Sequence, residues 1–210
     1  MAEIILVRHG QTAWNVAEVF WGQMDIELDA TGLRQAELLA EYLGHTKLEA
    51  VYSSPLRRAI QTAEVIAHHH SLSVEITAGL NDINFGEWQG LSLNEARIKY
   101  GELYSAWVTT PHQVRFPSGE SLDEVRERAV ALVNELVDKY EGAVVLVSHR
   151  VVHKVLICAL LGLDNSRFWS IRLDTCGLTT FEYADGQFVL TEHNNTSFLK
   201  PLKQDRPSDF

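Results

Sequence analysis

The chain has little of several features that would define its class at once. Only two of its 210 residues are cysteine, which excludes a disulfide-stapled scaffold. No apolar run reaches the 18 residues or so of a membrane-spanning helix, and no signal peptide or internal repeat is recognisable. Cationic residues are also few, because 18 Lys and Arg stand against 28 Asp and Glu, a formal net charge of -10. We therefore expect a soluble, cytoplasmic protein that binds neither nucleic acid nor a membrane surface.

The residues that are present suit a single α/β domain. Hydrophobic residues make up 46% of the chain, enough for a substantial core at this length. Apolar strands alternate with helices expected at residues 31–43, 55–70, 121–139 and 151–161, and a hairpin is expected at 178–183 and 188–192. This pattern predicts a three-layer α/β/α sandwich with a mainly parallel central sheet. We expect residues 1–200 to form the domain and 201–210 a flexible tail.

Two of the apolar strands end in a histidine. Residues 4–7 lead into Arg8 and His9, and residues 144–147 lead through one serine into His149. Consecutive apolar residues indicate strands buried on both faces, and ligands of parallel sheets bind beyond the carboxyl ends of the strands. A neutral imidazole beside a guanidinium suits attack on a phosphoryl group. The Arg8-His9 pair taken alone could equally be a strand end with a solvated histidine, and His149 taken alone is better explained as a hydrogen-bonded core histidine.

A third candidate lies at the start of a helix. After a short strand at 51–52, Ser54 is expected to be the N-cap and Pro55 the first helical residue. Arg58 would then lie near the helix N-terminus, where free backbone amides and the helix dipole attract anions. This position favours phosphate binding by the Arg58 guanidinium.

In this order the motifs resemble those of the histidine phosphatase superfamily, the phosphoglycerate mutase-like proteins. An Arg-His-Gly tripeptide alone is common, but five motifs at matching spacing are specific. The resemblance implies a phosphoglycerate mutase-like fold and a transiently phosphorylated histidine, with no cofactor and no metal. The matching segments are residues 6–15, 20–28, 54–63, 80–90 and 147–149.

The resemblance implies a catalytic set. His9 would be the nucleophile, with Arg8, Arg58 and His149 as the positive pocket around the phosphoryl oxygens. Asp82 matches the acid that protonates the leaving oxygen, although many members have glutamate there. Such an acid should be buried with a raised pKa. To attack through one ring nitrogen, His9 needs the other nitrogen protonated and held, and a backbone carbonyl of its turn is the expected partner.

Further residues are expected to bind substrate or to line the entrance. Asn15 and Gly22 could instead be plain turn residues. Aromatic residues of the loops either line the entrance or simply pack the lid, and the sequence favours neither. The expected substrate-binding residues are Asn15, Gly22, Trp21 and Arg150, and the loop aromatics are Trp14, Trp21, Phe85, Trp88 and Trp107.

Three polar side chains of the same region have weaker claims. His112 and Arg115 could meet a substrate carboxylate, but a solvated loop position is the better interpretation of each. Glu87 is a fallback acid and is better explained as a surface carboxylate. Ser121 and Glu124 have the spacing of a capping box, a purely structural role.

Two departures from the family pattern favour a phosphatase over a mutase. True mutases follow the second histidine with Gly-Asn, whereas here Arg150 and Val151 follow His149, and residues 91–119 contain no basic insertion. The sequence thus predicts a metal-independent phosphomonoester hydrolase for small metabolites such as phosphoserine, alpha-ribazole phosphate or sugar phosphates. A cofactor-dependent phosphoglycerate mutase and a phosphate-binding pseudoenzyme remain the alternatives. The expected state is a monomer or a homodimer.

The remaining cysteines and histidines suggest no further site. Cys158, in an apolar helix, and Cys176, before a strand, are expected to be buried thiols. Residues 68–70 are three consecutive histidines at a helix end, where adjacent side chains diverge by about 100 degrees and a shared metal ion is disfavoured.

Overall fold

The structure of the protein is a computed structural model that describes residues 2–15 and 19–202, without the side chain of Asn15. The strands are Ala2–Arg8 (β1), Leu48–Ser53 (β2), Val74–Ile76 (β3), Ala143–Ser148 (β4), Leu178–Ala184 (β5) and Gln187–Asn195 (β6). The helices are Ala30–Leu43 (α1), Arg57–His69 (α2), Leu93–Lys99 (α3), Gly101–Thr109 (α4), Leu122–Lys139 (α5) and Arg150–Leu160 (α6). Every helix predicted above forms within two residues of its expected bounds.

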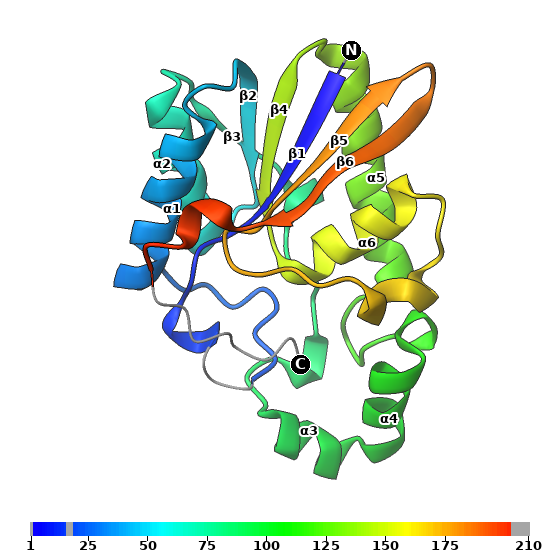
Figure 1. The fold of residues 1–210 in the computed structure, drawn as a ribbon. Helices are drawn as coiled ribbons and strands as arrows, with labels where there is room; N and C mark the ends of the chain where they lie inside the picture. Colours follow the sequence, from blue (N-terminus) through cyan, green and yellow to red (C-terminus); the bar gives the residue numbers. More distant parts are fainter. Residues whose placement is uncertain (1, 16–18, 203–210) are drawn as a thin grey trace.

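The strands form one six-stranded sheet in the order β3-β2-β4-β1-β5-β6. The first four are parallel, and β5 and β6 are antiparallel. Helices cover both faces of this sheet in Figure 1, which confirms the predicted three-layer α/β fold with a mainly parallel sheet. The predicted hairpin is also confirmed. Its turn residues Asp185 and Gly186 both have positive φ, at 52° and 77°, as a two-residue hairpin turn of type I′ requires.

Alternate side chains of β1 explain why this strand is apolar throughout. Ile4 and Leu6 belong to the core cluster that includes residues of α5 and α6, whereas Ile5 and Val7 belong to the cluster that includes residues of α1 and α2. Successive side chains of a strand point to opposite faces. A strand with helices on both faces must therefore be apolar at every position, as predicted for residues 4–7.

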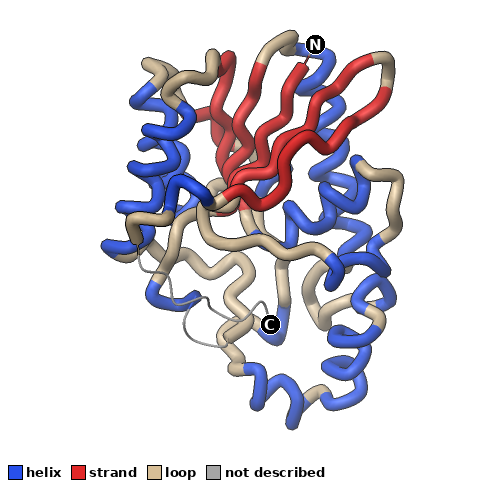
Figure 2. The backbone as a smooth tube through the Cα atoms, viewed as in Figure 1, coloured by secondary structure: helices blue, strands red, loops and turns tan. Residues whose placement is uncertain are grey.

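The end of the sheet where β1, β2 and β4 finish is covered by loops and by α3 and α4 (Figure 2). Phe85, Trp88 and Trp107 are at most 6% exposed there and pack around Phe116 with ring centroids 4.8 to 5.2 Å from it. For these three residues, packing of the lid is therefore the correct explanation. Trp14 and Trp21 form a separate stacked pair.

The predicted N-cap of α2 is wrong, and the helix starts two residues later than expected. The helix begins at Arg57 with Leu56 as its N-cap, and that cap makes no side-chain hydrogen bond. Ser54 is not the cap, and Pro55 precedes the helix rather than opening it. The Ser54 hydroxyl accepts only a long hydrogen bond of 3.4 Å from the Leu56 amide, because its closer partner is His149.

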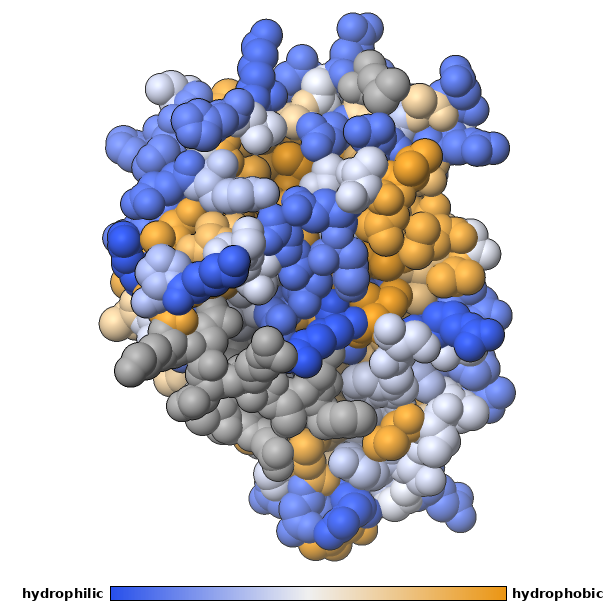
Figure 3. All heavy atoms as spheres, viewed as in Figure 1, coloured by the Kyte–Doolittle hydropathy of each residue, from blue (hydrophilic) through white to orange (hydrophobic). Residues whose placement is uncertain are grey.

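Other local predictions are confirmed. Cys158 and Cys176 are free and buried, and Ser121 and Glu124 form a reciprocal capping box at the start of α5. In the view of Figure 3 the surface is mostly hydrophilic, with hydrophobic residues gathered toward the right side. Among the described helices, none combines the length and apolar character needed to span a lipid bilayer. Of the predicted tail, residues 203–210 lie outside the described part of the chain.

Candidate active site

Neighbouring strands bring the candidate residues to one edge of the sheet. His9 follows β1, Ser54 follows β2 and His149 follows β4, and β4 lies between β2 and β1 in the sheet. The backbone amide of His9 donates to the Ser148 carbonyl at 3.0 Å, and that of Ser54 donates to the Val147 carbonyl at 3.0 Å. These hydrogen bonds continue the sheet pattern past the strand ends, so the backbone positions from which the three side chains extend are fixed.

The His9 ring is buried and held in one orientation. Its Nδ1 lies 2.7 Å from the Gly10 carbonyl, and because a carbonyl can only accept, Nδ1 must carry the hydrogen. The predicted backbone partner is thereby confirmed. Burial, followed by the charges of Arg58 and Arg8, lowers the His9 pKa well below its ordinary value. The ring is therefore neutral near pH 7, with its lone pair on Nε2.

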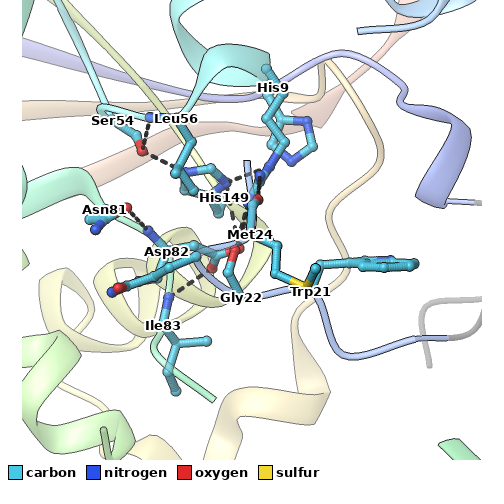
Figure 4. A network of polar contacts seen from close by, with 12 residues as sticks. His9, Trp21, Gly22, Met24, Ser54, Leu56, Asn81, Asp82, Ile83 and His149 are labelled. Atoms are coloured by element: carbon cyan, nitrogen blue, oxygen red, sulfur yellow. Dashed lines mark hydrogen bonds and ion pairs between the residues drawn. The ribbon is translucent and has the colours of Figure 1, made fainter. Parts of the chain in front are cut away.

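The second histidine is held by two side chains. Arg58 Nε donates to His149 Nδ1 at 3.3 Å, so the neutral His149 ring carries its hydrogen on Nε2 and donates it to Ser54 Oγ at 2.7 Å. Burial and then the Arg58 charge lower the His149 pKa well below its ordinary value. The rings of His9 and His149 lie with their centroids 5.2 Å apart. Figure 4 shows the two rings with Ser54 and Asp82 in one polar network.

Arg58 joins these groups to two further segments. Its Nη1 donates to the Met24 carbonyl and its Nη2 to the Gly22 carbonyl, both at 2.8 Å, and Nη2 also reaches Asp82 Oδ2 at 3.1 Å. Gly22 has φ +49°, and a Cβ there would lie 2.7 Å from the Ile83 carbonyl. Only glycine fits this close approach, so the motif glycine presents its carbonyl to the arginine.

Asp82 is a buried acid. Its side chain is 13% exposed, and burial raises its pKa although the Arg58 charge opposes this. Asp82 Oδ1 accepts the Ile83 amide at 2.9 Å, and Oδ2 lies 3.6 Å from His149 Nδ1. The structure thus gives Asp82 the burial and the direction of pKa shift that a general acid needs.

Two further arginines contribute charge to this end of the sheet. Arg8 is 8% exposed, its Nη1 donates to the Leu173 carbonyl, at 2.6 Å, and its charge is among those that lower the His9 pKa. Arg150 is the first residue of α6, and its charge acts to lower the Asp82 pKa. Both cations therefore act on the buried cluster, and contact with substrate stays a prediction for each.

The remaining predicted substrate-binding residues lie on the segment after β1. Trp21 stacks on Trp14 with ring centroids 3.9 Å apart, and its indole N–H donates to the Trp14 carbonyl at 3.0 Å. In Figure 4 the Trp21 ring lies beyond Met24, away from the two histidines. Asn15 ends the 3-10 turn Ala13–Asn15, and its side chain lies outside the described residues.

The weaker candidates occupy the lid. Glu87 is exposed and accepts a hydrogen bond from the Tyr100 hydroxyl at 2.8 Å, as its interpretation as a surface carboxylate requires. Arg115 is 66% exposed and pairs with Glu124 at 2.7 Å. His112 lies in the turn Pro111–Gln113. Substrate contact by His112 or Arg115 stays a prediction.

Sequence reasoning missed the partners that orient the site. Ser54 was assigned to a helix cap rather than to His149, and the Met24 carbonyl had no signal at all because any residue supplies a carbonyl. Among the described residues, no group of three or more His, Cys, Asp or Glu side chains is arranged to hold a metal ion.

Comparison with known proteins agrees with this architecture. The chain matches the sequence model of the histidine phosphatase superfamily (branch 1) over residues 4–196. It is 36% identical to phosphoserine phosphatase 1 of Hydrogenobacter thermophilus over 200 residues, 95% of each chain. The structure is similar to that of Bacillus stearothermophilus YhfR, with a TM-score of 0.91 and 28% identity over 95% of this chain and 100% of that one. It is also similar to the alpha-ribazole phosphatase of Shigella flexneri, with a TM-score of 0.84 and 27% identity over 92% and 96%.

The fold is therefore that of the phosphoglycerate mutase-like proteins. The chain belongs to the histidine phosphatase superfamily, branch 1, because both the family model and the relative cover nearly all of it. The resemblance seen in the five sequence motifs is confirmed.

Proposed function

We propose that His9 is the nucleophile of a metal-independent phosphomonoesterase that works through a phosphohistidine. The chain is a phosphatase of its superfamily, and its relatives indicate small phosphorylated metabolites as substrates. The proposal for His9 rests on its fixed ring. Because Nδ1–H is engaged by the Gly10 carbonyl and the His9 pKa is lowered by burial and by Arg58 and Arg8, Nε2 is an unprotonated nucleophile near neutral pH.

In the first step, His9 Nε2 attacks phosphorus in line and the bond from phosphorus to the leaving oxygen breaks. Asp82 gives its proton to that oxygen, so an alcohol leaves and the phosphoryl group stays on His9. In the second step, Asp82 takes a proton from water as the water oxygen attacks phosphorus. The bond between phosphorus and Nε2 then breaks, and phosphate leaves with neutral His9 and protonated Asp82 restored.

The charge on the transferring phosphoryl group needs cationic donors. The proposed cations are Arg58 and Arg8, and the neutral imidazole of His149 is proposed as a further polar contact; all three lie at the end of the sheet beside His9. The Arg58 guanidinium at present donates to the carbonyls of Gly22 and Met24. Phosphoryl oxygens would compete for those donors in a site that is already desolvated, where such bonds are strong.

Among substrates we propose phosphoserine first, because the relative at 36% identity is a phosphoserine phosphatase. Alpha-ribazole phosphate and sugar phosphates follow. We also propose that residues 1–200 act as one domain and that Asn15, Trp21, Gly22 and Arg150 surround the substrate. The cytoplasmic location and the state of monomer or homodimer stay predictions from the sequence.

The test is release of inorganic phosphate from phosphoserine, alpha-ribazole phosphate, sugar phosphates and aryl phosphates with EDTA present. We expect the unmodified protein to release phosphate and His9→Ala to release none. Intact-mass measurement of protein denatured in base during turnover should show one added phosphoryl group, which base leaves in place and acid removes. Release that persists in His9→Ala, or that EDTA stops, would contradict the proposal.

A further inference from the structure

One ion pair outside the catalytic cluster contacts the segment that carries Asp82. Arg128 on α5 and Glu120, just before α5, form a two-pronged pair in which Arg128 Nε lies 3.0 Å from Glu120 Oε1 and Nη2 lies 3.3 Å from Oε2. Both side chains are more than three quarters buried, at 22% and 23% exposure. Parallel two-pronged pairs of this kind are the geometrically specific form of an arginine–carboxylate contact.

The remaining Arg128 donors hold the backbone of residues 78–84, here called the acid loop. Nη1 donates to the Gly79 carbonyl at 3.0 Å and to the Ala78 carbonyl at 3.4 Å, and Nη2 donates to the carbonyl of Asp82 itself at 3.2 Å. One guanidinium thereby fixes the start of the loop and the residue that bears the acid. The contacts to Gly79 and Asp82 are partly buried, so solvent competes less for them than for the exposed contact to Ala78, and the Asp82 carbonyl also accepts from Gln23 Nε2 at 3.0 Å.

Glu120 holds the other end of the acid loop. Its Oε2 accepts the Asn84 amide at 2.8 Å, and its own backbone amide donates to the Asn84 carbonyl at 2.8 Å. The Arg128–Glu120 pair therefore contacts the loop on both sides of Asp82. The Asp82 carboxyl takes no part in these contacts, since it faces Arg58, His149 and the Ile83 amide.

We propose that Arg128, locked by Glu120, is a positioning residue that sets the place from which Asp82 delivers its proton to the leaving oxygen. Aspartate is one methylene shorter than glutamate, so its reach depends wholly on where the backbone lies. An error of about 1 Å in such a position can cost about 10²-fold in rate. This inference rests on the proposed function of Asp82 as general acid.

The test compares two esters that differ in the basicity of the leaving oxygen, phenyl phosphate and p-nitrophenyl phosphate. Both place an aromatic ring in the same position, but nitrophenolate leaves with little protonation whereas phenolate needs it. The quantity compared is kcat/KM, because it reports events up to loss of the alcohol and is not altered by a slow second step. Arg128→Lys keeps the positive charge but removes the planar guanidinium and its two-pronged contact. Glu120→Gln keeps Arg128 and removes the carboxylate that pairs with it.

For Arg128→Lys we expect kcat/KM for phenyl phosphate to fall by about tenfold or more. This is part of the rate factor of about 10² to 10⁴ that general acid catalysis supplies. For p-nitrophenyl phosphate we expect a change of less than about threefold, since that ester has little need of the acid. Glu120→Gln should show the same selectivity to a smaller degree. Arg126→Gln is the control, because Arg126 lies on the same helix, is partly exposed like Arg128 and donates instead to the Leu163 carbonyl. It should leave kcat/KM for both esters unchanged.

Equal losses on the two esters, or no loss on either, would overturn the positioning role. If Arg128→Lys does not fold, Glu120→Gln decides by the same comparison. Asp82→Asn separates this inference from the proposal on which it rests. If Asp82→Asn lowers kcat/KM equally for the two esters, Asp82 is not the acid. If Asp82→Asn affects phenyl phosphate more than p-nitrophenyl phosphate but neither Arg128→Lys nor Glu120→Gln does so, only the role of Arg128 is refuted.

Discussion

Replacing Ser54 by alanine tests the hydrogen-bond chain that fixes the second histidine. In the folded protein, Arg58 Nε donates to His149 Nδ1 and His149 Nε2 donates to Ser54 Oγ at 2.7 Å. The Ser54→Ala variant loses the acceptor of the His149 Nε2 hydrogen. A hydrogen on Nδ1 is disfavoured, because that nitrogen would then face the Arg58 donor at 3.3 Å, and the Asp82 carboxyl oxygen is farther away at 3.6 Å. The variant therefore leaves one ring N–H without a partner.

The cost follows from burial. His149 is 1% exposed and Ser54 is fully buried, so water does not replace the lost hydroxyl without rearrangement. A buried donor left unpaired costs about 1–3 kcal/mol. For a domain of this size, about 1 kcal/mol lowers the melting temperature by about 2–4 °C. We therefore expect Ser54→Ala to melt about 2–12 °C below the unmodified protein, and kcat/KM for phenyl phosphate to fall by about tenfold if about 1.4 kcal/mol of transition-state alignment is lost.

The assay is thermal unfolding together with steady-state kinetics and nitrogen NMR of the imidazole rings. Ser53→Ala is the matched control, since Ser53 is equally buried but its hydroxyl donates to the Ser54 carbonyl at 2.9 Å instead. The control should lose some stability and keep its kcat/KM. An NMR spectrum with the His149 hydrogen on Nδ1, or equal kinetic effects of the two substitutions, would refute the assignment of this chain.

Two further predictions concern the nucleophile and its turn. We expect kcat/KM to fall as pH drops through the lowered His9 pKa, because His9 must be neutral, and to fall as pH rises through the raised Asp82 pKa, because Asp82 must be protonated. The pH profile of Asp82→Asn should lack the fall at higher pH. If that fall remains in the variant, Asp82 is not its source. A Cβ on Gly10 would lie 2.6 Å from the Gly32 carbonyl, so Gly10→Ala should lose about 1–3 kcal/mol in urea unfolding. Gly101→Ala, at the start of α4 where a Cβ meets nothing within 4 Å, is its control and should be at least as stable as the unmodified protein.

The strands that end in the two histidines could be predicted because their signals are local. A run of consecutive apolar residues is required wherever a strand has helices on both faces, and the core clusters on either side of β1 show that requirement met. The hairpin turn at Asp185 and Gly186 is likewise local, since both positions need positive φ and these residue types tolerate it. Such features depend on a few neighbouring residues and so are visible in the chain itself.

The start of α2 could not be predicted because a distant residue changed the role of a local signal. Ser54 and Pro55 have the pattern of a helix start, but the Ser54 hydroxyl lies 2.7 Å from His149, 95 positions away in the chain. A hydrogen bond to a buried ring is favoured over one to the first free amides of a helix, which water can also satisfy. The helix consequently begins at Arg57.

The aromatic residues of the lid show the same limit. Phe85, Trp88 and Trp107 are far apart in the sequence, and nothing local distinguishes a ring that lines an entrance from one that packs a core. Their burial around Phe116 depends on where α3, α4 and the loops settle. Only the packing of these segments could decide between the two interpretations.

The sequence by itself determined the family and the layered α/β fold and named the candidate site residues, because motifs and apolar periodicity lie in short stretches of chain. The tertiary structure alone decided which ring nitrogen of each histidine holds its hydrogen, because that choice depends on acceptors and donors at fixed distances: the Gly10 carbonyl for His9, and Arg58 and Ser54 for His149. It also decided how the loop bearing Asp82 is held. Arg128 and Glu120 contact that loop only because α5 and the residues just before it pack against the loop in the folded protein.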